Sequence, residues 1–315
     1  MDVALKVLQQ VVIMLLIMLV GMIAYRTKVI SKEGNKQLSN LLLMVVNPAL
    51  LFMAYDTDYD AKHLQGLMLS LGITAVSLLV LIVLSHFLVS DKQKAYQVER
   101  FAATYSNCGF IGIPIVNGVF GAEGVFYLTG VVTVFNLFVW THGIILMGGQ
   151  SGQKPTVKER IKKLCSPALI AALLGLVIYL LQIPLPTILT DSLGYISDMN
   201  TPLAMLIAGL TLAQSDLKTV FLKKRIYYVS FLKLILYPAV ILLMFRWMPI
   251  DPIILLSITI SLGGPVATVC TAFALRFDNH PVYASELFAV STILSAATLP
   301  LVMMFNVFLE TVFHW

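Results

Sequence analysis

Apolar segments long enough to cross a lipid bilayer recur along the whole chain. A membrane-spanning helix needs roughly 20 mostly apolar residues, and segments of this kind fill most of the sequence. Hydrophobic residues make up 59% of the chain and charged residues only 12%, whereas a soluble domain carries about 25% charged residues. The sequence therefore predicts an all-α integral membrane protein with ten transmembrane helices. The predicted spans are residues 3–25, 38–54, 64–89, 99–120, 124–147, 166–183, 199–213, 226–248, 252–275 and 283–309.

Lysine and arginine are concentrated in the loops that follow the odd-numbered spans. Because basic loops stay on the cytoplasmic side, we expect a multi-pass protein of the cell membrane, with both termini outside and the first span retained. The net charge of +5 then reflects topology, and we expect no nucleic-acid partner. The basic residues of these loops are Arg26, Lys28, Lys32, Lys36, Lys92, Lys94, Arg100, Lys154, Lys158, Arg160, Lys162, Lys163, Lys218, Lys223, Lys224, Arg225 and, after span 9, Arg276.

The sequence carries no signature of catalysis, of a metal site or of a cofactor. Cys108, Cys165 and Cys270 are odd in number and show no C-x-x-C spacing, so neither a disulfide framework nor a zinc site is predicted. No phosphate-binding G-x-x-x-x-G-K-[ST] motif is present, and no motif supplies a nucleophile or paired acids. We therefore expect no metal, no cofactor and no enzymatic activity.

Two predicted spans are interrupted by glycine and proline beside polar residues. Span 4 contains "SNCGFIGIPIV" at 106–116, and span 9 contains "SLGGPVATVCT" at 261–271. Spans 2 and 7 also match, with "NP" at 47–48 in one and "NTP" at 200–202 in the other, and the interrupted spans follow them at nearly equal distances. A single kink is usually accommodated by neighbouring helices. Matched interruptions in both halves instead indicate a repeat.

The matched interruptions divide the chain into two repeats of five spans. An odd number of spans makes the second repeat enter the membrane in the opposite orientation, which is the inverted-repeat architecture of many secondary transporters. We expect the first repeat at 1–150, a cytoplasmic linker at 151–165 and the second repeat at 166–315. The linker segment "TVKERIKKL" fits a short interfacial helix and a plain solvated connection equally well.

The interruptions predict a polar binding site inside the membrane. Unwound backbone leaves N–H and C=O groups that need protein, water or a ligand as partners. Half-helices that begin at Pro114 and Pro265 would direct their positive ends toward this site, and such ends favour anions. With no arginine beside either interruption, we expect helix ends and polar side chains to bind a small carboxylate. The predicted site residues are Asn47, Ser106, Asn107, Gly109, Gly112, Pro114, Asn136, Gly263, Gly264, Pro265 and Thr268.

At these residues the chain resembles the auxin efflux carrier family, which includes bacterial permeases for malate- and malonate-like acids and the plant auxin exporters. The resemblance lies in "NPALLF" at 47–52, "SNCGFIGIPIVNGVFG" at 106–121, "TPLAMLIAGLTLA" at 201–213 and "FALRFDNHP" at 273–281. It implies a scaffold domain from spans 1, 2, 6 and 7, a transport domain from spans 3–5 and 8–10, and crossing of the broken helices 4 and 9. It also implies that Asn107 faces the substrate. The chain lacks the long central loop of the plant exporters and differs around the span-9 interruption, so auxin is not the expected substrate.

Lys233 and Glu286 are charged residues that fall within predicted spans. Lys233 in span 8 and Glu286 in span 10 fall near the cytoplasmic ends, so they either form a functional pair or extend separately to the membrane interface. We favour the second interpretation. His142 and His280 are expected to mark interfaces, and Asn136 fits a cavity-lining residue and a helix–helix hydrogen bond equally well.

The sequence thus predicts a secondary transporter of small organic anions that works by alternating access in an elevator-like manner. An anion channel and a membrane-embedded enzyme are the alternatives, and the enzyme lacks any catalytic motif. A coupling proton or sodium ion is left open, and a homodimer in the lipid bilayer is the expected assembly.

Overall fold

The structure, a computed structural model, describes residues 2–148, 167–214 and 223–313 of the chain. Within these residues the chain forms helices and no β-strand, which confirms the all-α class. The expected linker at 151–165 and the "TVKERIKKL" segment lie outside the described residues.

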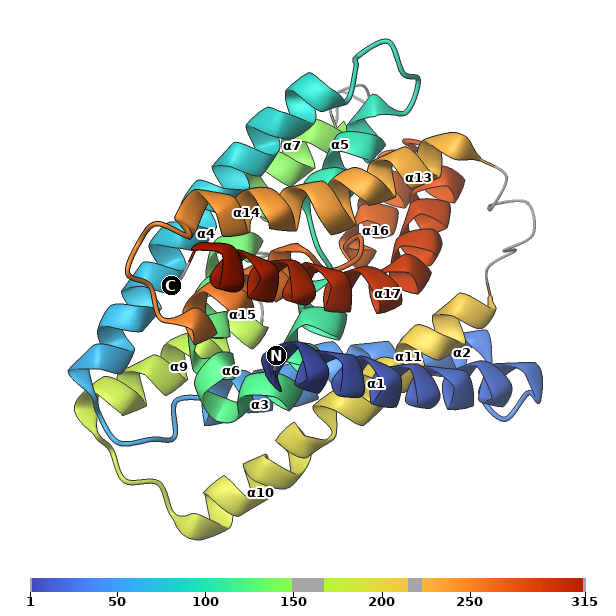
Figure 1. Cartoon of the computed structure of the whole chain (residues 1–315). Helices are drawn as coiled ribbons and strands as arrows, with labels where there is room; N and C mark the ends of the chain where they lie inside the picture. The colour runs from blue at the N-terminus through green and yellow to red at the C-terminus, as the bar shows by residue number, and fades with distance from the viewer. Residues whose placement is uncertain (1, 149–166, 215–222, 314–315) are drawn as a thin grey trace.

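The elements follow one another as α-helices interrupted by short π-helical turns, which are labelled η (Figure 1). In the first part of the chain they are α1 (Asp2–Arg26), α2 (Lys32–Leu41), η1 (Leu42–Val46), α3 (Asn47–Met53), α4 (Ala61–Leu88), α5 (Tyr96–Thr104), η2 (Cys108–Gly112), α6 (Ile113–Phe138), η3 (Val139–Gly143) and α7 (Ile144–Gly148). In the second part they are α9 (Pro167–Leu181), α10 (Thr187–Asp198), α11 (Asn200–Ala213), α13 (Lys224–Phe231), η4 (Leu232–Leu236), α14 (Tyr237–Phe245), α15 (Pro252–Leu262), α16 (Thr268–Arg276) and α17 (Pro281–Phe313).

Several helical segments have the length and composition needed to cross a membrane. Three shorter apolar helices, at Val12–Arg26, Pro167–Leu181 and Pro252–Leu262, accompany six longer segments among the described residues. The arrangement of ten spans and the inverted repeat stay predictions. The six longer segments are Lys32–Met53, Ala61–Leu88, Cys108–Gly148, Thr187–Ala213, Lys224–Phe245 and Pro281–Leu309.

Three of the π-helical turns are followed directly by an α-helix with proline at its second position. After η1, η2 and η4 the prolines Pro48, Pro114 and Pro238 are each the second residue of the next α-helix. Proline lacks a backbone N–H and its ring presses on the preceding turn, and a π-helical turn is one way in which a helix absorbs this disturbance. The helix is therefore widened before Pro114 and continues through it.

The first interruption lies earlier in the chain than the sequence predicted. Helical structure is lost at Tyr105–Asn107, and the chain is helical again from Cys108, so the following half-helix does not begin at Pro114. The prediction that 109–114 is unwound was wrong, because the π-helical turn accommodates Pro114. The second interruption, at residues 263–267, includes the predicted Gly263, Gly264 and Pro265. The helix that follows it, α16, begins at Thr268, so the prediction that this half-helix begins at Pro265 was wrong. A third irregularity, Gly121 with φ of 63°, divides α6 internally.

The helices pack in two groups. One group consists of α1, α2, α3, α9, α10 and α11, with α1 packed along α11 and α3 along α9. In the other, α6 packs against α4 and α15, and α17 packs against α13 and α16. In Figure 1, α1, α2, α10 and α11 lie in the lower part of the view, and α5, α13 and α14 lie in the upper part. Contacts of α1 with α6 and α17 join the groups.

Candidate functional site

The two interruptions meet and pair through their backbones. The Asn107 N–H donates to the Pro265 carbonyl at 2.7 Å, and the Ala267 N–H donates to the Tyr105 carbonyl at 3.0 Å. Ser106 and Val266 thus form an isolated antiparallel bridge. We call the two paired segments, residues 105–107 and 265–267, the crossing. Buried backbone groups need hydrogen-bond partners, and here each unwound segment supplies them to the other. The pairing explains how two unwound segments persist in an apolar interior.

Lys233, in the π-helical turn η4, hydrogen-bonds to residues of both broken helices at this crossing. Its side chain is fully buried, and its Nζ donates to the Thr104 carbonyl at 3.1 Å, to Ser106 Oγ at 2.7 Å and to the Leu262 carbonyl at 2.9 Å. Ser106 Oγ in turn donates to the Leu262 carbonyl at 2.6 Å. The prediction that Lys233 extends to the membrane interface was therefore wrong, because the polar groups of the crossing satisfy its ammonium inside the protein.

Glu286 does not pair with Lys233. Its carboxylate, on a side chain about one-tenth exposed, accepts from Lys223 Nζ at 2.6 and 2.7 Å. Glu99 is likewise occupied by Arg225 at 2.7 Å and by the Tyr283 hydroxyl at 3.0 Å. The alternative of a Lys233–Glu286 pair was therefore also wrong, since both groups have other partners.

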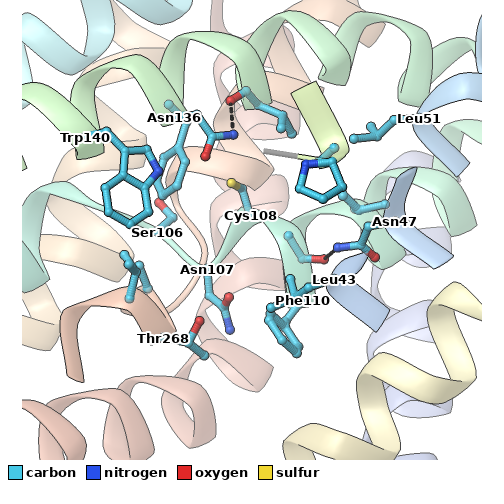
Figure 2. Close-up of a pocket in the computed structure, with 18 of the residues that line it drawn as sticks. Leu43, Asn47, Leu51, Ser106, Asn107, Cys108, Phe110, Asn136, Trp140 and Thr268 are labelled. Atoms are coloured by element: carbon cyan, nitrogen blue, oxygen red, sulfur yellow. Dashed lines mark hydrogen bonds between the residues drawn. The ribbon is translucent and has the colours of Figure 1, made fainter. Parts of the chain in front are cut away.

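A cavity of about 680 Å³ opens beside the crossing. The helices that follow the two interruptions both line it with their first residues. These are Cys108 and Gly109 of η2 and Thr268 and Val269 of α16. Figure 2 shows the labelled side chains around this space. The described residues that line it are Leu43, Met44, Asn47, Leu51, Ser106, Asn107, Cys108, Gly109, Phe110, Ile113, Val132, Phe135, Asn136, Trp140, Pro167, Ala168, Ala267, Thr268, Val269 and Arg276.

Asn107 lines this cavity with a side chain whose amide has no hydrogen bond within the described part of the chain. Its backbone is engaged at both ends, since the Asn107 carbonyl accepts from the N–H groups of Ile111 and Gly112 at 3.0 and 3.3 Å. In the view of Figure 2, the Asn107 amide and the Thr268 hydroxyl lie on the same side of the cavity. The position thus combines a fixed main chain with an amide that can serve a ligand.

Asn47 and Asn200, which the sequence places at matched positions, contact each other directly. Asn200 Nδ2 donates to Asn47 Oδ1 at 2.6 Å, and Asn47 Nδ2 donates to the Gly109 carbonyl at 3.4 Å. Both side chains are buried. The matched motifs of α3 and α11 therefore meet at the edge of the first interruption, and Asn47 also lines the cavity.

The other predicted site residues divide into cavity-lining and supporting positions. Asn136 lines the cavity, but its amide donates to the Val132 carbonyl of its own helix at 2.8 Å, and within the described segments it makes no bond to another helix. The remaining five are not among the described lining residues; they belong to the helix after the first interruption and to the second interruption. These supporting residues are Gly112, Pro114, Gly263, Gly264 and Pro265.

Comparison with known proteins places this architecture in a family. Residues 6–303 of the 315 match the family described as "Membrane transport protein". The chain belongs to this transporter family. It is the family of the auxin efflux carriers, so the resemblance seen in the sequence motifs is confirmed. The match covers both interruptions and all the cavity-lining residues.

Similar family members come from archaea and bacteria. An "Uncharacterized transporter" of Methanothermobacter thermautotrophicus is 28% identical over 93% of this chain and 96% of its own length. The "Uncharacterized transporter YfdV" of Escherichia coli K12 is 24% identical over 91% and 93%. A Rhizobium meliloti protein named "Putative malonate transporter" is 23% identical over 84% and 85%. Family membership and the apolar helices together identify the chain as a multi-pass membrane transport protein.

In this family member, Arg276 is a cavity residue that the sequence analysis missed. Thr268 and Arg276 are the first and last residues of α16, and both line the cavity. The sequence had assigned Arg276 to a loop, and the expectation that no arginine lies near the interruptions was wrong. The signal was available, since two helical turns from Thr268 return a side chain toward the same side of a helix.

The cavity of this transporter is also lined by aromatic residues that the sequence had not indicated. Trp140, Phe135 and Phe110 line it, and the ring of Trp140 lies edge-on to Phe273 with centroids 5.0 Å apart. His142, expected to mark an interface, instead contacts the first interruption, because its Nδ1 lies 2.8 Å from the Tyr105 hydroxyl. Regular apolar spacing gives no signal for which aromatic residues of a membrane helix face a cavity.

Proposed function

We propose that this protein is a secondary transporter that moves a small organic carboxylate across the cell membrane by alternating access. The observation that carries the proposal is the crossing itself. Two interrupted helices pair through their backbones, and the starts of both outgoing half-helices line one cavity. Interrupted helices that meet at a binding site are typical of secondary transporters.

The chemistry of the lining favours an anion. Backbone N–H groups at helix starts carry partial positive charge, Asn107 offers amide donors, and Arg276 adds a full positive charge at the far end of α16. Among the described lining residues there is no carboxylate. Because one relative is named for malonate, a short dicarboxylate is the first substrate class to test.

The packing suggests which parts move. We propose that the group of α1, α2, α3, α9, α10 and α11 is a scaffold and that the group containing both interrupted helices is the transport domain. The cavity lies between them, since Asn47 and Pro167 line it from the first group and Asn107 and Thr268 from the second. Sliding of the second group along the first would carry the ligand across the membrane, as in an elevator.

Counterflow in proteoliposomes tests this function. Vesicles preloaded with unlabelled malonate should take up labelled malonate several-fold faster than empty vesicles, because a carrier returns faster when loaded. Protein-free liposomes supply the background, and other mono- and dicarboxylates supply the specificity. Uptake that is equally fast with and without preloading would favour an anion channel. If the protein took up neutral or cationic solutes but no carboxylate, the proposal of an anion carrier would be refuted.

A further inference from the structure

Lys233 is a fully buried charge within the candidate span Lys224–Phe245, whose other charges, Lys224 and Arg225, lie at its first two positions. Its ammonium makes three hydrogen bonds, all to oxygen atoms. Charges inside membrane helices are costly and are retained where they serve a function. Neither Glu99 nor Glu286, the buried carboxylates of this region, bonds to it. Among the described residues, the ammonium is thus balanced by dipoles and not by a counter-charge.

The oxygen atoms around Lys233 belong to the ends of the two broken helices. Thr104 is the last residue of α5, and Leu262 is the last residue of α15. The carbonyls at a helix C-terminus lack intrahelical partners and carry partial negative charge. Two such ends converge on one point, with Ser106 Oγ as the third oxygen. In transporters, unwound carbonyls and half-helix C-termini form sites for small cations.

We propose that Lys233 is a covalently tethered cation that occupies a site suited to a monovalent metal ion, so that the crossing needs no dissolved cation. The ammonium neutralises the negative ends of α5 and α15 on one side of the crossing. The cavity receives the positive starts of η2 and α16 on the other side. Lys233 does not line the cavity, so it acts as a positioning residue through Ser106, which does.

The proposal about Lys233 has two consequences, and only the second rests on the proposed transport function. The first consequence is structural: a variant without the ammonium should acquire a site for sodium. The second is functional: transport by the unmodified protein should not require sodium or potassium. Each can fail while the other holds.

Thermal unfolding of purified Lys233→Ala tests the first consequence. In choline chloride the variant should unfold on the order of 5 °C below the unmodified protein, because buried carbonyls lose their donor. Sodium chloride at the same ionic strength should restore much of this loss with a saturating concentration dependence. Lys233→Met should be destabilised and not restored, since its side chain fills the space that an ion and water would take.

Lys223→Ala is the matched control, because it removes a lysine of the same region whose partner is Glu286. Its unfolding temperature should not distinguish sodium from choline. An unfolding temperature of Lys233→Ala that equals that of the unmodified protein, or that responds identically to sodium and choline, would overturn the proposal.

The unmodified protein provides a test that does not depend on folding of the variant. Its unfolding temperature should be the same in sodium, potassium and choline chloride, and counterflow of any transported carboxylate should proceed at an unchanged rate when choline replaces both metal ions. A strict requirement for sodium or potassium in either measurement would show that a dissolved cation binds at the crossing. Absence of carboxylate transport under all conditions would contradict the proposed function and leave the thermal result to decide the cation site.

Discussion

Asn107 combines two roles that belong to different parts of one residue. Its N–H and carbonyl complete the crossing and start the η2 turn, with hydrogen bonds to Pro265, Ile111 and Gly112. Its side chain faces the cavity. Side-chain substitution should therefore alter ligand binding and leave the crossing in place.

Asn107→Asp separates the two roles. The aspartate keeps the shape and the backbone bonds, but it loses the amide donors and repels an anion. We expect the affinity for the best carboxylate to fall by about 1.5–3 kcal/mol, the range for a lost hydrogen bond to a charged group, with little change in unfolding temperature. Isothermal titration calorimetry measures the effect. Asn35→Asp is the control, because Asn35 bonds to Thr211 away from the cavity, and equal affinities in both variants would remove Asn107 from the site.

At the scale of elements, the second interruption contains two adjacent glycines, and neighbouring atoms approach Gly263 more closely than they approach Gly264. A Cβ on Gly263 would lie 2.7 Å from the Thr259 carbonyl oxygen and 2.9 Å from Pro238 Cβ, whereas a Cβ on Gly264 would lie no closer than 3.4 Å to any of its neighbours. A proline ring and a backbone carbonyl cannot move aside as a flexible side chain can. The second interruption therefore requires glycine at its first position.

Gly263→Ala and Gly264→Ala test this requirement as a matched pair. Overpacking of a tight interior costs about 1–3 kcal/mol, so Gly263→Ala should lower the unfolding temperature and reduce counterflow severely. Gly264→Ala should remain close to the unmodified protein in both measurements. Equal tolerance of the two substitutions would mean that α14 does not pack against the interruption as described.

The sequence predicted the position of the second interruption but not the start of the helix after it, and it placed the first interruption too far along the chain. At residues 263–265 glycines and proline coincide with the unwound backbone. Around Pro114 the π-helical turn η2 absorbs the proline, and the unwound segment at Tyr105–Asn107 is defined by its pairing with residues 265–267. That pairing joins distant parts of the chain, and no local pattern encodes it. The partners of Lys233 escaped prediction for the same reason, because two of its three acceptors are backbone carbonyls.

At the scale of the whole molecule, the charged loops predict the orientation in the membrane, and the two helix groups predict the movement during transport. The loop at Asp58 precedes α4, and the loop at Lys92 follows it. The charge distribution assigns these loops to opposite sides of the membrane. The 28 residues of α4 are enough to span it.

Labelling from outside the cell tests the orientation. In a variant in which Cys108, Cys165 and Cys270 are replaced, Asp58→Cys should react with an impermeant thiol reagent in intact cells, and Lys92→Cys should react only after the membrane is opened. Both side chains are exposed in the structure, so access depends on the membrane alone. Labelling of Lys92→Cys in intact cells would reverse the proposed orientation.

The elevator-like movement requires the two groups to slide past each other, so a covalent link between them should stop transport. Gln10 of α1 and Gly118 of α6 belong to different groups and lie in direct contact, since a Cβ on Gly118 would touch the Gln10 side chain. Neither residue lines the cavity. In the cysteine-free background, a disulfide formed between Gln10→Cys and Gly118→Cys by an added oxidant should abolish counterflow, and an added reductant, which cleaves the disulfide, should restore it. A link between Asn35→Cys and Thr211→Cys, whose native side chains bond at 2.9 Å within the first group, should leave counterflow intact. Full activity of the cross-linked Gln10–Gly118 pair would exclude sliding at this contact, because a bonded pair cannot separate while the transport domain moves.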